Sequence, residues 1–137
     1  MTDYLSAQLD ENELRALGSI ALAHVGDAVY ELLVRTYLCT HGRATGKTLH
    51  RAAVELVRAS AQARFAGRLA GRLTEEEESV FRRGRNANVH TIPHASDPAE
   101  YRQATALEAL FGYLYLKGER VRISELFGFL MEGDHAS

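Results

Sequence analysis

Two acidic residues, Asp27 and Glu108, lie in separate apolar segments of the chain that are rich in small side chains. Asp27 follows Gly26 within Leu22–Leu33, and Glu108 lies within Ala104–Leu116. A buried carboxylate is costly unless it is paired or bound to a metal, so the simpler interpretation of either acid is an exposed position on an amphipathic helix. Two converging carboxylates, however, suit a hard cation such as Mg²⁺. With a phosphodiester as a further ligand, they indicate hydrolysis at phosphorus.

The spacing around both acids is helical, which defines the elements that must position them. Residues at steps of three or four share a helix face with each acid: Ile20, His24 and Glu31 with Asp27, and Ala104, Thr105, Phe111 and Gly112 with Glu108. The small residues of both segments permit close approach of two helices. A crossing of these helices would bring the two carboxylates together.

Helical patterns fill nearly the whole chain, and nothing in it resembles a β-hairpin or a regular series of strands. Residues 84–96 form the longest irregular stretch, and we expect a frayed tail from about residue 133. The sequence predicts one all-α domain over residues 1–137 without an interdomain linker. The expected helices run from the Asp10–Glu13 capping pair to Gly18, over about Ser19–Thr40, from Thr48 as far as Ala63, from the Thr74–Glu77 capping pair to Arg83, from Asp97 and Pro98 to Lys117, and from Ser124 onward.

Composition indicates a globular protein of a reducing compartment. The chain has 46% hydrophobic and 25% charged residues, and its single cysteine, Cys39, excludes an intrachain disulfide. We interpret Cys39 as a small core or interface residue. No apolar run approaches the roughly 18 residues of a membrane span, and the acidic N-terminus lacks the basic start of a signal peptide. We therefore expect no membrane partner and a cytoplasmic location.

The net charge of −2 conceals an uneven distribution. Residues 1–40 carry two basic and six acidic residues, residues 41–90 carry ten and five, and residues 91–137 carry four and seven. A basic middle between acidic ends suits a protein that presents one face to a polyanion. Ordinary solvated helix faces are the alternative explanation.

Other chemical motifs fail on spacing. Gly42–Thr48 resembles a phosphate-binding P-loop but has three residues between its glycines where four are needed, and it follows a helix instead of a strand. His90 and His94 have the spacing of a zinc pair, but Pro93 lies between them and no further ligand pair exists. Neither a nucleotide site nor a structural zinc site is expected.

Three blocks stand in order along the chain: Leu22–Leu32, Arg82–Ala87 followed by Pro93, and Tyr101–Leu116. Together they resemble the catalytic domain of the ribonuclease III family, and most closely its compact Mini-ribonuclease III branch. The similarity extends from about Leu14 to Leu130.

This resemblance implies an all-helical, Mg²⁺-dependent endoribonuclease that acts as a homodimer on double-stranded RNA. Each subunit would cut one strand and leave 5′-phosphate and 3′-hydroxyl ends. The Mini branch is associated with maturing the base-paired ends of precursor 23S ribosomal RNA, which makes ribosomal proteins of the assembling large subunit further conceivable partners. Asp27 and Glu108 match the family's catalytic, metal-binding acids.

The chain departs from the full-length family at two positions. Ala23 and Thr105 stand where those enzymes carry a further glutamate and a further aspartate. The Mini branch shares this thinner pattern, which implies more coordination through water. Glu31 and Thr105 are candidates to support the ligands from outside, although a structural role for Glu31 is as plausible.

The domain uses up the chain, so we expect no separate double-stranded-RNA-binding module, and the catalytic domain must hold the duplex itself. RNA duplexes are recognised mainly through shape and phosphates. The first candidates for this contact are Arg82, Arg83, Arg85 and Asn86, followed by Lys47, Arg51 and Arg102. A solvated surface position is the alternative for each of them.

Two hypotheses from other classes compete with the nuclease. Ala23 and Thr105 would suit a non-catalytic RNA-binding or ribosome-assembly factor whose metal site has decayed. A metal-free helical interaction module would neither bind nor cleave a duplex.

Overall fold

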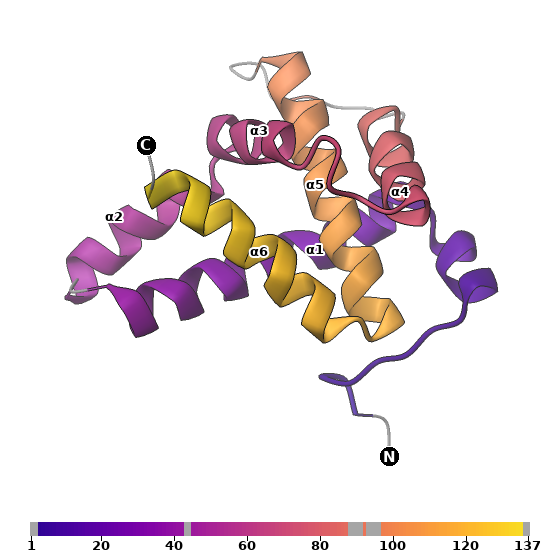
Figure 1. The fold of residues 1–137 in the computed structure, drawn as a ribbon, viewed down its shortest axis with the longest axis horizontal. Helices are drawn as coiled ribbons and strands as arrows, with labels where there is room; N and C mark the ends of the chain where they lie inside the picture. The colour runs from indigo at the N-terminus through magenta and orange to yellow at the C-terminus, as the bar shows by residue number, and fades with distance from the viewer. Residues whose placement is uncertain (1–2, 43–44, 88–91, 93–96, 136–137) are drawn as a thin grey trace.

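The computed structural model describes residues 3–42, 45–87, 92 and 97–135, and these contain six helices and no strand (Figure 1). The all-α prediction is therefore confirmed. The helices are α1 (Glu11–His41), α2 (Gly46–Val57), α3 (Ala59–Arg68), α4 (Glu75–Arg85), α5 (Pro98–Lys117) and α6 (Arg120–His135).

The longest helix, α1, has a break at Gly18 where the sequence predicts one. Asp10 and Glu13 form the expected capping box, in which the Asp10 carboxylate accepts from the Glu13 N–H at 2.8 Å. Gly18 then adopts φ 78° and ψ 167°, a conformation open to glycine and outside the helical region. The break divides α1 into a short capped segment and a long core segment.

By length and composition alone, α1 is apolar enough to cross a membrane. The mean hydropathy of its most apolar window is 1.4, and 33% of that window is buried within the fold. By this measure, the expectation that no run approaches the length of a span is wrong. The packing of α1 against α5 accounts for the apolar character, because that contact is the most extensive between any two of the described helices.

The predicted helix from Thr48 through Ala63 is wrong as a single element. Arg58 has extended backbone angles (φ −65°, ψ 155°), which separate α2 from α3. The break also changes which side of α3 is buried. The sequence predicts Ala59, Ser60 and Ala63 on the apolar side, whereas the buried residues of α3 are Ala61, Gln62, Phe65 and Ala66.

The N-termini of α4 and α5 are both capped as predicted. Thr74 and Glu77 form a capping box for α4, and Asp97 accepts from the Ala99 N–H at 2.9 Å at the start of α5. Helix α4 continues to Arg85, so the irregular stretch begins later than residue 84. Gly118 ends α5 in the left-handed conformation with φ 88°.

The last helix differs from its prediction at its start. Helix α6 begins at Arg120, one turn before Ser124, so Ser124 lies inside the helix and does not cap it. At its other end, α6 continues to His135, beyond the expected start of a frayed tail at about residue 133. The short α5–α6 connection at Gly118 makes the earlier start possible.

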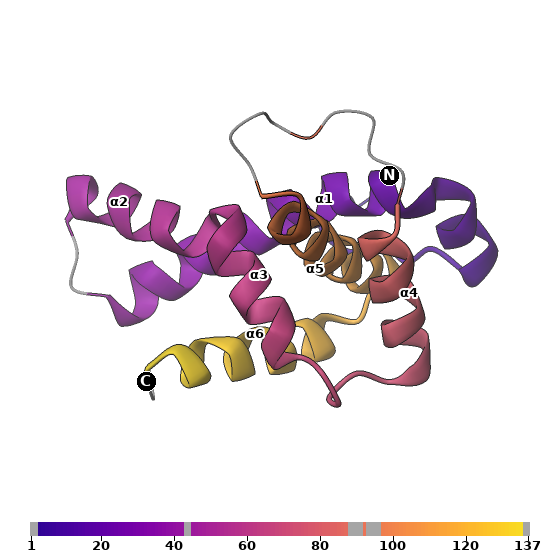
Figure 2. The same ribbon diagram turned by 90° about the horizontal axis from the view of Figure 1, so that it is seen from above.

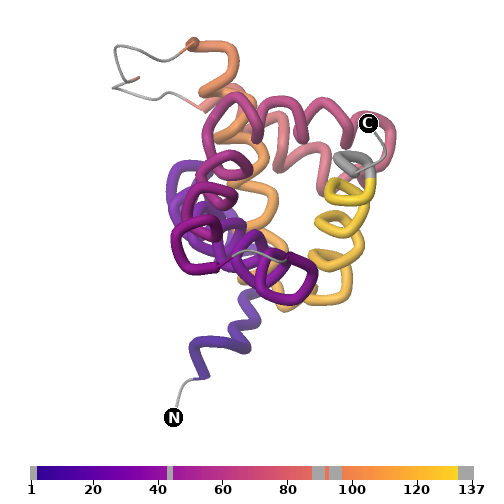
Figure 3. The backbone as a smooth tube through the Cα atoms, turned by 90° about the vertical axis from the view of Figure 1, so that its left-hand side faces the viewer, coloured from indigo at the N-terminus to yellow at the C-terminus, as the bar shows by residue number. Residues whose placement is uncertain are grey.

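Helix α5 forms the centre of the molecule (Figure 2). It is buried on most sides from Ala104 to Leu114 and packs against α1, α3, α4 and α6. Helices α1 and α6 lie on opposite sides of it (Figure 3). An element buried all round has no marked polar side, so a charged residue on it, such as Glu108, requires a local explanation.

Candidate active site

Two glycines bring α1 and α5 into backbone contact. A Cβ atom added at Gly26 would lie 1.6 Å from the Glu108 carbonyl oxygen, and one at Gly112 would lie 1.9 Å from the Leu22 carbonyl oxygen. A side chain at either position would therefore separate the helices. The predicted close approach of the two acidic segments is confirmed.

This crossing places Asp27 beside Glu108. Asp27 is exposed at the rim of the contact, whereas Glu108 is partly buried beneath it. Burial, a hydrogen bond with Asp27 and the negative charge of Asp27 together raise the pKa of Glu108 to about 8. In the absence of a cation, the pair therefore holds a proton near neutral pH, with the Glu108 carboxyl donating to the Asp27 carboxylate.

A third side chain, Gln62 of α3, reaches the pair. Its Nε2 donates to the Val57 carbonyl oxygen at 2.8 Å and to Glu108 Oε2 at 3.4 Å. The sequence interpretation missed Gln62, because a continuous helix through Arg58 would have turned other residues of α3 inward. The signal that could have identified it is the spacing of Gln62 with the apolar residues Phe65 and Ala66, three and four positions further on, which places Gln62 on the buried side of α3.

The donor set of the acidic pair fits a magnesium ion. No group of three or more His, Cys, Asp or Glu side chains that could hold a metal occurs among the described residues. Mg²⁺ is commonly bound through one or two carboxylates and retains several waters. The adjacent carboxylates of Asp27 and Glu108 meet this requirement, which makes them candidate ligands.

The two candidates for supporting roles are engaged elsewhere in this structure. Glu31 forms an ion pair with Arg35 at 3.1 Å on the surface of α1. Thr105 is buried, and its hydroxyl donates to the Tyr101 carbonyl oxygen at 2.9 Å within α5. Their roles around the acidic pair remain predictions.

The basic end of α4 is held against the turn of α5 that carries Glu108. A Cβ atom at Gly84 would lie 2.9 Å from the Ala109 Cβ and 3.0 Å from the Ala106 Cα. This contact places exposed cationic and amide side chains on a helix that packs against the turn of α5 carrying Glu108: Arg82, Arg83, Arg85 and Asn86.

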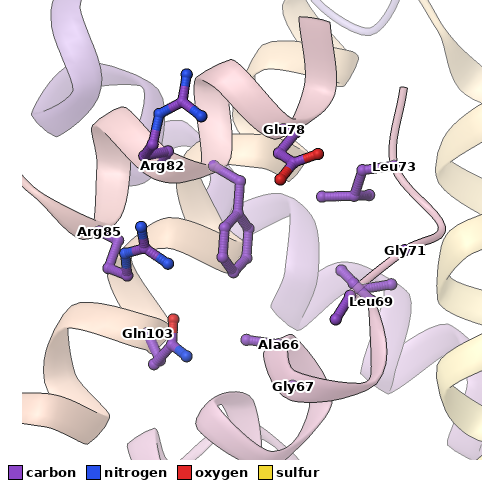
Figure 4. A pocket seen from close by; sticks show the side chains of 11 residues that line it. Ala66, Gly67, Leu69, Gly71, Leu73, Glu78, Arg82, Arg85 and Gln103 are labelled. Carbon is purple, nitrogen blue, oxygen red and sulfur yellow. The ribbon is translucent and has the colours of Figure 1, made fainter. Parts of the chain in front are cut away.

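A hollow of about 190 Å³ lies beside this basic end (Figure 4). Arg82 and Arg85 line it from α4, and Gln103 lines it from α5. Figure 4 shows Arg85 and Gln103 side by side at its edge. Cations around a concave surface suit contact with phosphate groups.

The weaker RNA-binding candidates are spread over two other places. Lys47 and Arg51 are exposed on α2. Arg102 is partly buried, and its Nη1 donates to the Ala87 carbonyl oxygen at 3.5 Å, which ties α5 to the end of α4. His90, Pro93 and His94 lie outside the described residues. Cys39 is exposed, so its interpretation as a core residue is wrong.

Comparison with known proteins places this architecture in a family. The Ribonuclease III domain model matches residues 20–119, which include Asp27, Glu108 and the parts of α1 and α5 that cross. A crystal structure of a Fusobacterium nucleatum protein superposes with a TM-score of 0.79 at 30% identity, covering 89% of this chain and 98% of that one.

Curated relatives indicate which group within this family the chain belongs to. The chain is 48% identical to Mini-ribonuclease 3 of Symbiobacterium thermophilum over 80% of this chain and 85% of that protein. It is 46% identical to Mini-ribonuclease 3 of Gloeobacter violaceus over 93% and 92%. The chain belongs to the ribonuclease III domain family and, within it, to the Mini-ribonuclease 3 group; it is an endoribonuclease.

Proposed function

We propose that this protein cleaves double-stranded RNA in a Mg²⁺-dependent reaction and matures the base-paired ends of precursor 23S ribosomal RNA in the cytoplasm. The observation that carries the proposal is the contact between Asp27 and Glu108 at the glycine-lined crossing of α1 and α5. Each cut would leave a 5′-phosphate and a 3′-hydroxyl.

The roles of the residues follow from their positions. Asp27, at the rim, faces incoming substrate, and Glu108, beneath it, loses its proton when a cation replaces that proton. Mg²⁺ bound by the pair would polarise a phosphate and activate water for attack on phosphorus. The fixed crossing keeps both carboxylates in position, which limits the reorganisation needed at the moment of reaction.

The basic end of α4 supports recognition of a duplex. Phosphates run along both strands of an RNA helix, and Arg82, Arg83 and Arg85 are spaced over one turn of α4. Their contacts would position the duplex without reading its sequence.

A second copy of the chain would complete the enzyme. Ile20, His24, Ala28 and Leu32 lie at steps of four along α1 and are exposed; Ile20 and Leu32 are 52% and 60% exposed. An exposed apolar stripe of this kind on a helix supports a self-complementary interface. Because Asp27 adjoins it, a homodimer would hold two acidic pairs near one duplex and cut both strands.

The test uses a precursor 23S fragment with its paired ends and an unrelated RNA duplex of equal length. We expect Mg²⁺-dependent cuts in the paired ends, with 5′-phosphate and 3′-hydroxyl termini, and sedimentation of the protein as a dimer at micromolar concentration. Binding of both duplexes without cleavage would instead indicate an RNA-binding or assembly factor. A strictly monomeric protein would contradict cutting of both strands by one complex.

A further inference from the structure

Gln62 occupies an unusual position for a neutral polar side chain. It is 3% exposed on α3 and lies next to the acidic pair, although it comes from neither helix of the α1–α5 crossing. Its side chain connects the break between α2 and α3 to Glu108 on α5.

The hydrogen bonds fix the orientation of the amide. The Val57 carbonyl can only accept, so the atom 2.8 Å from it must be Nε2. The second hydrogen on Nε2 is then directed to Glu108 Oε2, and Oε1 bonds to neither partner. Oε1 is buried and accepts no hydrogen bond within the part of the chain that the structure describes.

Burying Oε1 without a hydrogen-bond donor destabilises the fold, and packing at this position does not require an oxygen. A buried acceptor left unpaired costs about 1–3 kcal/mol, and a methionine would fill a similar volume without that cost. Closing the end of α2 at Val57 needs only the donor of the amide, not its oxygen. An oxygen that is costly for the fold and lies at a reactive site indicates a ligand.

We propose that Gln62 is a positioning residue of the active site, which holds the Glu108 carboxylate through Nε2 and offers Oε1 to a water molecule that enters with Mg²⁺. The inference rests on the proposed function. It supplies a third protein group, from a third helix, to a site with only two carboxylates. Groups that orient metal ligands in this way typically change metal affinity or activity 10–100-fold when they are removed.

The experiment compares Gln62→Met with Gln103→Met. Gln103 also has a buried Oε1 without a partner among the described residues, but it lines the hollow beside α4. Titration calorimetry with MnCl₂ and with MgCl₂ on metal-free protein gives the ion affinity, thermal unfolding gives stability, and single-turnover cleavage of a duplex gives the rate.

For Gln62→Met, we expect at least about tenfold weaker ion binding and a slower single-turnover rate with unchanged affinity for the duplex. Loss of the hydrogen bond to Val57 offsets the relief of the unpaired Oε1, so we expect little change in the unfolding temperature. For Gln103→Met, we expect unchanged ion binding. A purely structural role of Gln62 predicts the reverse pattern: a lower unfolding temperature with wild-type ion affinity. That result would overturn the proposal.

Gln62→Asn provides a second variant if the methionine variant does not fold. Its amide is one methylene shorter and cannot reach both Val57 and Glu108, so we expect the same weakening of ion binding. Wild-type ion affinity in a folded Gln62→Asn would also overturn the proposal. If the wild-type chain itself neither binds the ion nor cleaves a duplex, the proposed function fails; if it does both and the Gln62 variants match it, only this inference fails.

Discussion

Buried Glu77 and partly buried Glu108 have opposite environments. Glu77 is 5% exposed at the start of α4, where Arg122 of α6 donates to both of its carboxylate oxygens at 2.8 Å. Its hydrogen bonds and the charge of Arg122 outweigh its burial, and the pKa of Glu77 is lowered. Glu108 faces a second carboxylate, and burial together with that neighbour raises its pKa.

The difference separates a structural acid from one whose charge the fold leaves unbalanced. Glu77 is satisfied within the chain and joins α4 to α6, so it needs nothing from outside. Glu108 receives one hydrogen bond from the neutral Gln62, and its charge beside Asp27 is balanced by a proton or a cation that comes from outside the chain. Burial of an acid is therefore uninformative about function until its partners are identified.

The largest expected effect comes from breaking the crossing that creates the acidic pair. Gly26→Ala would drive a Cβ into the backbone of α5, where neither side can yield by rotating a side chain. Overpacking usually costs about 1–3 kcal/mol, and we expect about 4 kcal/mol or loss of folding here, measured by urea unfolding.

Gly128→Ala is the matched control within α6. A Cβ at Gly128 meets no atom within 4 Å, so we expect a gain of up to about 1 kcal/mol from helix propensity. Equal stabilities of Gly26→Ala and Gly128→Ala would show that α1 and α5 do not meet as described.

Removing the charge of the structural acid has the next largest effect. Glu77→Gln removes the carboxylate that pairs with Arg122 at 2.8 Å and leaves that guanidinium the longer contact with Glu125 at 3.9 Å, and we expect a loss of about 3 kcal/mol in unfolding free energy. The cleavage rate per folded molecule should stay near wild type. A cleavage defect that exceeds the folding defect would assign Glu77 a role in the reaction and remove the contrast with Glu108.

Much of this architecture is predictable from local patterns. The capping pairs at Asp10, Thr74 and Asp97 and the break at Gly18 depend on neighbouring residues, and the structure confirms them. The meeting of Asp27 and Glu108 is also anticipated, because the small residues that permit it are visible in both segments.

What could not be predicted depends on tertiary contacts. Arg58 carries no helix-breaking signal, so the α2–α3 break and the inward turn of Gln62 do not follow from local sequence. The pairing of Glu77 with Arg122 joins residues that are 45 positions apart. Within the run Glu75–Glu78, the capping pair with Thr74 singles out Glu77 but does not predict that its side chain is buried.

The pH dependence of stability should differ between the two acids. In metal-free buffer, Glu108 binds a proton in the folded state up to its pKa of about 8 but only below about 4.5 when unfolded. This contribution is complete below the unfolded pKa and is lost as pH rises from about 4.5 to about 8. We expect the unfolding temperature in EDTA to fall over this range, less steeply in Glu108→Gln, whereas identical pH profiles of the two proteins would contradict the raised pKa.

The smallest expected effect concerns the basic end of α4. Arg83→Ala removes one exposed cation, and we expect modestly weaker binding of all RNA duplexes and a salt-dependence slope smaller by about one. Filter binding at several salt concentrations measures both quantities. An unchanged slope would place Arg83 outside the RNA contact and shift attention to Arg82 and Arg85.

The central claim is that Asp27 and Glu108 form a Mg²⁺-dependent cleavage site, and single-turnover cleavage of a long RNA duplex tests it most directly. The wild-type chain, Asp27→Asn and Glu108→Gln are compared with Mg²⁺ and with EDTA, after thermal unfolding has shown that all three are folded. We expect cleavage only by the wild type with Mg²⁺, and a loss of about a thousandfold or more in each variant. Full activity of Asp27→Asn, or cleavage by the wild type in EDTA, would contradict the claim.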